Sequence, residues 1–120
     1  MPEGSASLAQ AAKSTPDGPF NELAAEIAAV MISKGFPTPT DLGDPELVMS
    51  KLMLVVTELG EATEAIRKPP PDVENFYEEI ADAMIRLLHL CGGLNIDIDG
   101  EIAKKMAKNR ERPYLHGKRA

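Results

Sequence analysis

The chain has 120 residues, of which 43% are hydrophobic and only 4% aromatic, and its formal net charge is −6. This length fits one small domain, and an aliphatic core without tryptophan is typical of packed helices. No apolar run approaches the roughly 20 residues of a membrane-spanning helix, and the N-terminus lacks the pattern of a signal peptide. A single cysteine excludes an internal disulfide. We therefore expect a cytoplasmic protein with no membrane partner.

The first elements in chain order are a flexible arm and a helix. Residues 1–18 are rich in small residues, proline and glycine, which predicts an arm ahead of a helical domain at 19–120. Apolar side chains then recur at helical spacing over residues 21–34, and Gly35 is placed to end that helix. The following residues 36–43 contain two prolines and predict a loop.

A second, longer helix is expected between two boundary signals. Asp44 can cap its N-terminus, and Pro45 suits the first helical position because its missing N–H would have no partner there. Three consecutive prolines, Pro69 to Pro71, follow residue 68 and cannot continue a helix. These signals predict a helix from Pro45 to about residue 68.

Two further helices complete the chain. The third is expected to begin after a cap at Asp72 and to run to about residue 91, where Gly92 and Gly93 end it. The fourth opens at Asp97 or Asp99, runs to about residue 110 and ends before a proline. Because the connections are short, neighbouring helices should be antiparallel, and we predict an all-α, antiparallel helical bundle of about four helices.

The second helix also indicates an oligomer. Its residues 52–56, with the sequence LMLVV, are apolar on every side of a helix, and such a segment must be buried all round. Four helices cannot easily surround one of their own, so we expect a homodimer or a dimer of dimers whose second copy completes the bundle. The alternative is that the first helix and the arm supply the cover.

Four acidic residues in two pairs form the candidate site. Glu58 and Glu61 lie on the second helix, and Glu79 and Asp82 lie on the third. Each pair is spaced i, i+3, so both side chains share one helix face, and each lies in an apolar stretch. Buried like charges are costly unless a cation or proton neutralises them. All-carboxylate ligands favour Mg²⁺, Mn²⁺ or Ca²⁺. The alternative is a pair of solvated acidic faces.

The C-terminal segment has the opposite charge. Residues 104–120 hold seven basic residues against one acidic residue, a net +6, which leaves −12 on the preceding 103 residues. The acidic part would repel a long polyanion such as nucleic acid, whereas a small anionic ligand fits between a metal and the tail. The candidate ligand contacts are Lys105, Asn109, Arg112, Tyr114 and Lys118. The alternatives are a solvated tail for the basic residues and, for Tyr114, a role in covering the helix ends.

The acidic pairs and the C-terminal segment resemble the MazG family of all-α nucleoside triphosphate pyrophosphohydrolases. ELGEATEAIRK at 58–68 and EEIADAMIRLL at 78–88 are similar to the family's ExxE and ExxD motifs, and KMAKNRERPYLHGKRA at 105–120 is similar to its C-terminal segment. The resemblance covers residues 20–120. Many members have a further acid before the first motif glutamate, whereas this chain has Thr57.

The resemblance implies Mg²⁺-dependent hydrolysis of a (deoxy)nucleoside triphosphate to the monophosphate and pyrophosphate, with Mn²⁺ as a possible substitute. Carried over by position, Glu58, Glu61, Glu79 and Asp82 are the metal ligands, and Glu58 is the residue expected to align the attacking water. Two alternatives stay open: a phosphoribosyl-ATP pyrophosphohydrolase activity, or a non-catalytic helical regulator with a structural metal site.

Overall fold

The structure, a computed structural model, describes residues 14–113, and over this range it contains α-helices and no strand. The helices are α2 (Pro19–Ser33), α3 (Pro45–Arg67), α4 (Val73–Gly93) and α5 (Ile98–Glu111). The all-α class is confirmed for the described range, and each helix lies within two residues of its predicted bounds. Most of the expected arm, residues 1–13, lies outside the described residues.

Aspartate caps start three of the helices, as the sequence predicts for each. Asp44 accepts a hydrogen bond from the backbone N–H of Leu47 at 3.1 Å, directly before Pro45 at the first helical position. Asp72 caps α4 in the same way, and Asp97 caps α5. Each bond satisfies an N–H that has no partner within its own helix.

The end of α4 differs from the prediction, because Gly92 and Gly93 lie inside the helix instead of ending it. A Cβ at Gly92 would overlap the backbone carbonyl of Ala24 in α2. A Cβ at Gly93 would come within 2.6 Å of the Thr38 side chain. The two glycines therefore serve close packing. Asn95, with φ 53°, takes the left-handed conformation beyond the helix end that the sequence assigned to glycine.

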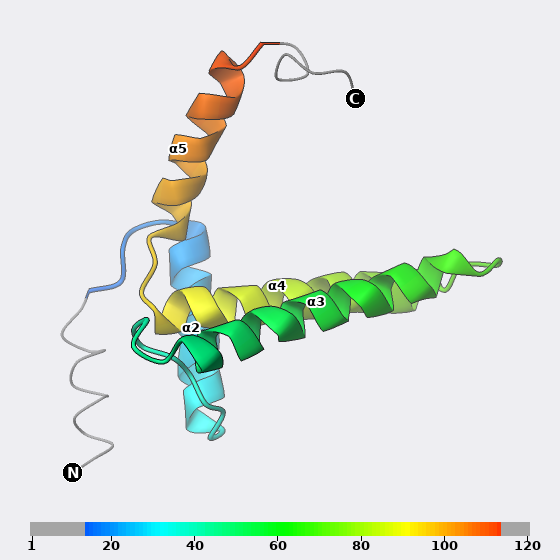
Figure 1. The fold of residues 1–120 in the computed structure, drawn as a ribbon, viewed down its shortest axis with the longest axis horizontal. Coiled ribbons are helices and arrows are strands. Elements are labelled where there is room, and N and C mark those ends of the chain that lie inside the picture. The colour runs from blue at the N-terminus through cyan, green and yellow to red at the C-terminus, as the bar shows by residue number, and fades with distance from the viewer. Residues whose placement is uncertain (1–13, 114–120) are drawn as a thin grey trace.

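The helices do not form the antiparallel bundle that we predicted. Among the helices of residues 14–113, only α3 and α4 pair along their length as an antiparallel hairpin, while α2 crosses that hairpin near the C-terminal end of α4 (Figure 1). The small side chains of Ala24 and Ala28, and the absence of one at Gly92, allow α2 to pack across α4 at this point. The packed core lies at this crossing, around Ala24, Leu88 and Cys91.

A polar clip joins the start of α5 to the start of α2. The buried Asn21 side chain donates to Asp97 at 2.8 Å and accepts from the backbone N–H of Ile98 at 2.8 Å, while its own backbone N–H donates to Asp99 at 2.7 Å. Beyond this clip α5 has no buried residue, and it projects away from the hairpin (Figure 1). Because the clip joins the starts of α2 and α5, these two helices diverge from it instead of packing along their lengths.

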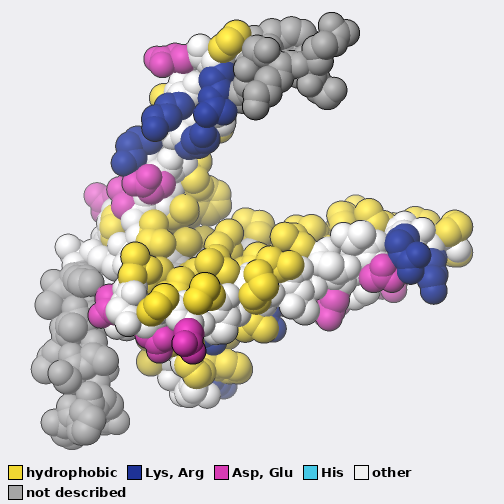
Figure 2. Space-filling view, viewed as in Figure 1, with side chains coloured by type: hydrophobic (Ala, Val, Ile, Leu, Met, Phe, Trp, Pro, Cys, Tyr) yellow, Lys and Arg dark blue, Asp and Glu magenta, His cyan; other side chains and the backbone are white. Residues whose placement is uncertain are grey.

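The hairpin carries apolar side chains that the described chain leaves uncovered. We name these residues the hairpin stripe, and they are between 37% and 67% exposed: Met49, Leu52, Val56, Leu59 and Ile66 on α3, and Val73, Tyr77, Ile80, Met84 and Leu87 on α4. Figure 2 shows hydrophobic side chains over the helix crossing and along the hairpin. No helix in residues 14–113 is both long and apolar enough to cross a membrane.

Candidate metal centre

The seam between α3 and α4 is built from small residues around two buried carboxylates. Ala62, Ala65 and Ala83 are each at most 9% exposed. Because alanine methyl groups let two helix axes approach closely, side chains beside them in the seam are removed from water. Glu58 and Glu79 occupy such positions and are 7% and 9% exposed.

Three of the four predicted metal ligands meet across this seam. One carboxylate oxygen from each of Glu58, Glu61 and Glu79 lies within 4.8 Å of the other two, and we call these three residues the carboxylate cluster. Asp82 is half-buried and lies near enough to Glu79 to help raise its pKa, but it lies outside this group of three. The i, i+3 pairs therefore face one another, with Asp82 at the edge.

The neighbouring acids change the proton affinity of Glu79. A hydrogen bond with Glu61, then burial, then the negative charges of Glu61 and Glu58 raise the pKa of Glu79 from its usual 4.5 to about 7. No basic side chain in residues 14–113 forms an ion pair with Glu79. A carboxylate nine-tenths removed from water and surrounded by acids needs a proton or a cation to neutralise it.

Sequence reasoning missed one member of the site, Arg86. Its Nε donates to Oε2 of Glu58 at 3.2 Å, an ion pair that links α4 to α3. Arg86 lies four residues after Asp82 and seven after Glu79, and this spacing places the three side chains on one face of α4. The spacing in the sequence therefore places Arg86 on the acidic face of α4, but it does not show that Glu58 of α3 is its partner.

An open hollow of about 440 Å³ extends from the carboxylate cluster toward the tip of the hairpin. Glu61 and Glu79 line its end at the cluster, and Lys68 and Asn75 line it nearer the tip. A ligand bound at the cluster would therefore find space, one cationic group and one amide on the same side of the hairpin, together with two further acids, Glu64 and Asp72.

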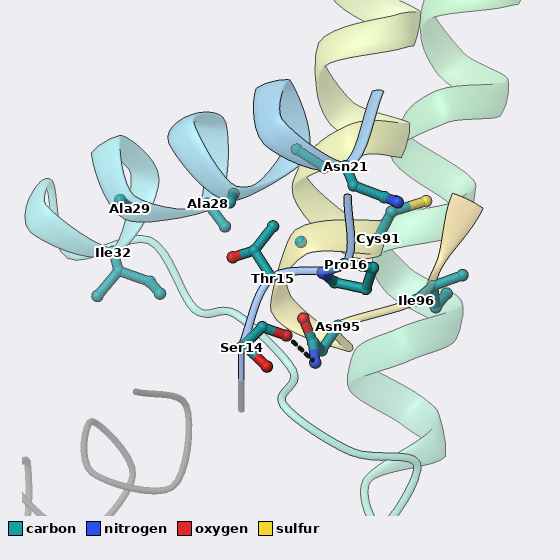
Figure 3. Close-up of a pocket in the computed structure, with 13 residues that line it drawn as sticks. Ser14, Thr15, Pro16, Asn21, Ala28, Ala29, Ile32, Cys91, Asn95 and Ile96 are labelled. Carbon is teal, nitrogen blue, oxygen red and sulfur yellow. Dashed lines mark hydrogen bonds between the residues drawn. The ribbon is translucent and has the colours of Figure 1, made fainter. Parts of the chain in front are cut away.

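A second hollow, of about 410 Å³, lies between α2 and the C-terminal end of α4 (Figure 3). Ala28, Ala29 and Ile32 line it from α2, and Cys91 lines it from α4. Its lining contains no acidic or basic side chain, and burial raises the pKa of the Cys91 thiol. This hollow therefore offers hydroxyl and amide groups but no charged side chain to neutralise a divalent metal or a phosphate group.

The predicted ligand contacts of the C-terminal segment are not near the cluster of the same chain. Lys105 and Asn109 are exposed on α5, and Arg112 follows its last residue. Because α5 packs against α2 and points away from the hairpin, the structure does not bring these three to the carboxylates (Figure 1). Tyr114 and Lys118 lie outside the described residues. The role of all five in binding a ligand stays a prediction.

Comparison with known proteins adds no relative from which a function could be transferred. No protein-family model matches the chain, and no curated protein or solved structure matches it either. The likeness to MazG-like pyrophosphohydrolases therefore rests on the sequence motifs, and the function must be argued from the chemistry of the cluster.

Proposed function

We propose that this chain is a Mg²⁺-dependent hydrolase that cleaves a (deoxy)nucleoside triphosphate to the monophosphate and pyrophosphate, as an enzyme of nucleotide-pool house-cleaning in the cytoplasm. The observation that carries the proposal is the meeting of three carboxylates within 4.8 Å on a seam that buries two of them. Such a group is stable at neutral pH only with a cation or protons bound. The MazG-like motifs then suggest the reaction.

The donor atoms at the seam suit a hard divalent cation. Glu58, Glu61 and Glu79 would hold it, and Asp82 lies beside Glu79 to complete an all-oxygen set that favours Mg²⁺ or Mn²⁺. When bound, such a cation would supply positive charge opposite the phosphate oxygens on which negative charge develops during attack at phosphorus. The residues present therefore fit the metal that the motifs imply.

Glu58 is the residue that we expect to orient the attacking water. Arg86 bonds to its Oε2, so Oε1 keeps lone pairs for a water or a cation. The carboxylate is buried and tied to α4, which limits its freedom to turn. A water held at Oε1 would attack the α-phosphorus, pass a proton to the carboxylate and break the bond to the leaving pyrophosphate.

The proposal includes a homodimer or a dimer of dimers. The exposed residues of the hairpin stripe recur at alternating steps of three and four along α4 and from Met49 to Leu59 on α3, with Ile66 seven residues further on, the spacing of helices that pack in coiled-coil fashion. Two hairpins that joined their stripes would form a four-helix bundle and cover Leu52 and Val56 of the segment 52–56, which are 41% and 53% exposed.

The charge of the chain favours a small substrate over a nucleic acid. The first 103 residues carry a net charge of −12, and a long polyanion laid over them would meet repulsion along its whole length. A single triphosphate needs only local neutralisation, which the cluster's cation would provide. We therefore propose a nucleotide substrate and no nucleic-acid partner.

A substrate panel tests the proposal. Canonical and damaged (deoxy)nucleoside triphosphates and phosphoribosyl-ATP are incubated with the protein and Mg²⁺, and pyrophosphate and monophosphate are both measured. We expect equimolar pyrophosphate and monophosphate from at least one nucleoside triphosphate. Cleavage of phosphoribosyl-ATP alone would move the proposal to that activity. No release from any substrate, together with retained metal binding, would replace the enzyme with a helical regulator that has a structural metal site.

A further inference from the structure

Arg86 contacts the carboxylate cluster, yet no motif of the sequence assigns it a role. It is the basic side chain within residues 14–113 that forms an ion pair with a member of the cluster. Its partner Glu58 is one of the three carboxylates whose oxygens lie within 4.8 Å of each other. A cation bound to the cluster would therefore meet a positive side chain already attached to one of its ligands.

The charges show what this pairing does before any cation is bound. Glu58, Glu61, Glu79 and Asp82 offer four carboxyl groups, and Arg86 offers one positive charge that reaches only Glu58 directly. Arg86 thus satisfies the carboxylate that is most buried and leaves Glu79 to be neutralised otherwise. A divalent cation that used both oxygens of Glu58 would compete with the guanidinium for Oε2.

The guanidinium also has donors to spare. It carries five N–H groups, of which the described residues take up one, the Nε–H bonded to Glu58. The arginine side chain is 37% exposed, whereas that of Glu58 is 10% exposed, so the unused end of the guanidinium lies nearer to water than the carboxylate. Two parallel N–H donors on a planar group match the spacing of phosphate oxygens.

We propose, building on the function proposed above, that Arg86 acts in two successive contacts. Without a cation, it holds and neutralises Glu58. Once a cation is bound at the cluster, the terminal nitrogens of Arg86, which Glu58 does not use, bind a phosphate oxygen of the polyphosphate chain. The phosphate-binding guanidinium thus lies on the same helix as Glu79 and Asp82. The basic residues of α5, in contrast, lie away from the cluster of their own chain.

The proposal predicts effects of opposite sign, measured without turnover. Mn²⁺ binding to EDTA-treated protein is followed by electron paramagnetic resonance in the absence of nucleotide. Arg86→Ala should bind Mn²⁺ about tenfold more tightly, because a nearby positive charge is removed. Inorganic tripolyphosphate is then titrated calorimetrically at saturating Mn²⁺, and here Arg86→Ala should bind roughly 10- to 100-fold more weakly, because a charged double hydrogen bond is lost.

Two further variants make the result decisive. Arg67→Ala removes an arginine that is 57% exposed and paired with Glu64 outside the cluster, and it should change neither affinity. Arg86→Lys keeps the charge but loses the planar fork, so it should bind Mn²⁺ like the wild type and tripolyphosphate several-fold more weakly. If Arg86→Ala does not fold, as judged by circular dichroism, the lysine variant decides.

Weaker or unchanged Mn²⁺ binding by Arg86→Ala would show that Arg86 merely holds Glu58 in place, and would overturn the proposal. Unchanged tripolyphosphate binding by Arg86→Lys and Arg86→Ala would overturn the phosphate contact. Neither titration contains a nucleotide or measures hydrolysis. A failure of the substrate panel would therefore refute the enzymatic function, whereas the Mn²⁺ and tripolyphosphate titrations would still test the role of Arg86.

Discussion

At the residue scale, the environment of Glu79 decides how the site behaves without a metal. Glu79 is 9% exposed as a residue, and its polar neighbours include Glu61 and Asp82. Such a group is neutralised either by a proton, which the raised pKa of about 7 expresses, or by a cation. Protons and metal therefore compete for the same site, and both should be visible in the stability of the protein.

We expect the metal-free protein to lose stability as the pH rises from about 5 to about 8. The folded protein keeps a proton on Glu79 until its pKa of about 7, whereas the unfolded chain loses it near 4.5. The folded state therefore binds more protons in this window, and its free energy of unfolding falls with rising pH. Urea unfolding in EDTA at the two pH values measures the change.

Glu79→Gln cannot lose a proton, so this variant should show a smaller fall in stability across the same window. Glu78→Gln is the matched control, because Glu78 is the exposed neighbour on the same helix and should leave the fall unchanged. If the wild type and Glu79→Gln lose the same stability between the two pH values, the prediction that folding raises the proton affinity of Glu79 is wrong.

Neutral variants of the four acids should abolish most of the activity. Glu58→Gln, Glu61→Gln, Glu79→Gln and Asp82→Asn should each lower the rate of pyrophosphate release by at least ~100-fold, the size expected for one positioned charge or base. Steady-state assays at saturating Mg²⁺ measure this loss, with Glu78→Gln as the active control. A rate within a few-fold of the wild type for Glu61→Gln or Glu79→Gln would exclude the cluster as the site.

The sequence predicted that acids of the two helices would meet but did not predict the contact of Arg86, for a physical reason. Two i, i+3 pairs on neighbouring helices can be placed on facing sides by helical periodicity alone, and Glu58, Glu61 and Glu79 do meet. The partner of Glu58 depends on how far α3 is displaced along α4. Packing at the alanines of the seam sets that displacement. No local sequence pattern encodes how the two helices pack there.

At the scale of elements, helix starts were easier to predict than the way helices cross. Asp44, Asp72 and Asp97 act locally, each on an N–H three residues away, so the sequence contains the whole interaction. Gly92 acts through contact with α2, more than 60 residues away in the chain. A glycine that ends a helix and a glycine that lets another helix approach look the same in the sequence.

Gly92→Ala should destabilise the protein by about 1–3 kcal/mol, since the added methyl group would overlap the carbonyl of Ala24 and force α2 away from α4. Gly60→Ala is the matched change in α3, where a Cβ meets no atom within 4 Å. This second variant should gain up to about 1 kcal/mol from helix propensity. Equal effects of the two changes in urea unfolding would contradict the close crossing.

If two copies of the chain pack through the hairpin stripe, a charged side chain placed in the stripe should disrupt the dimer. Leu52→Asp or Met84→Asp would carry an unpaired carboxylate into the proposed interface, so either variant should dissociate or aggregate. Size-exclusion chromatography with light scattering measures this, with Glu46→Asp, an exposed change in the first turn of α3, as the control. A folded wild-type monomer at low micromolar concentration would contradict the proposed dimer.

At the scale of the whole molecule, the described chain has most of its apolar packing at one end. The core lies where α2 crosses α4, and the hairpin reaches out from that crossing with its stripe exposed (Figure 1, Figure 2). The sequence indicated the exposed surface, because residues 52–56 need cover that four helices cannot give. It did not indicate the direction of α5, which depends on the clip between Asn21, Asp97 and Asp99.

The carboxylate cluster is proposed to work only with a divalent cation, and one measurement tests this most directly. The protein is dialysed exhaustively against EDTA, and pyrophosphate release from the preferred nucleoside triphosphate is then followed while Mg²⁺ is added back. We predict no release above background without the metal and a saturable recovery with Mg²⁺ or Mn²⁺, because the clustered carboxylates would repel an unneutralised triphosphate. Full activity in the EDTA-treated protein before any metal is added would contradict the proposed metal centre.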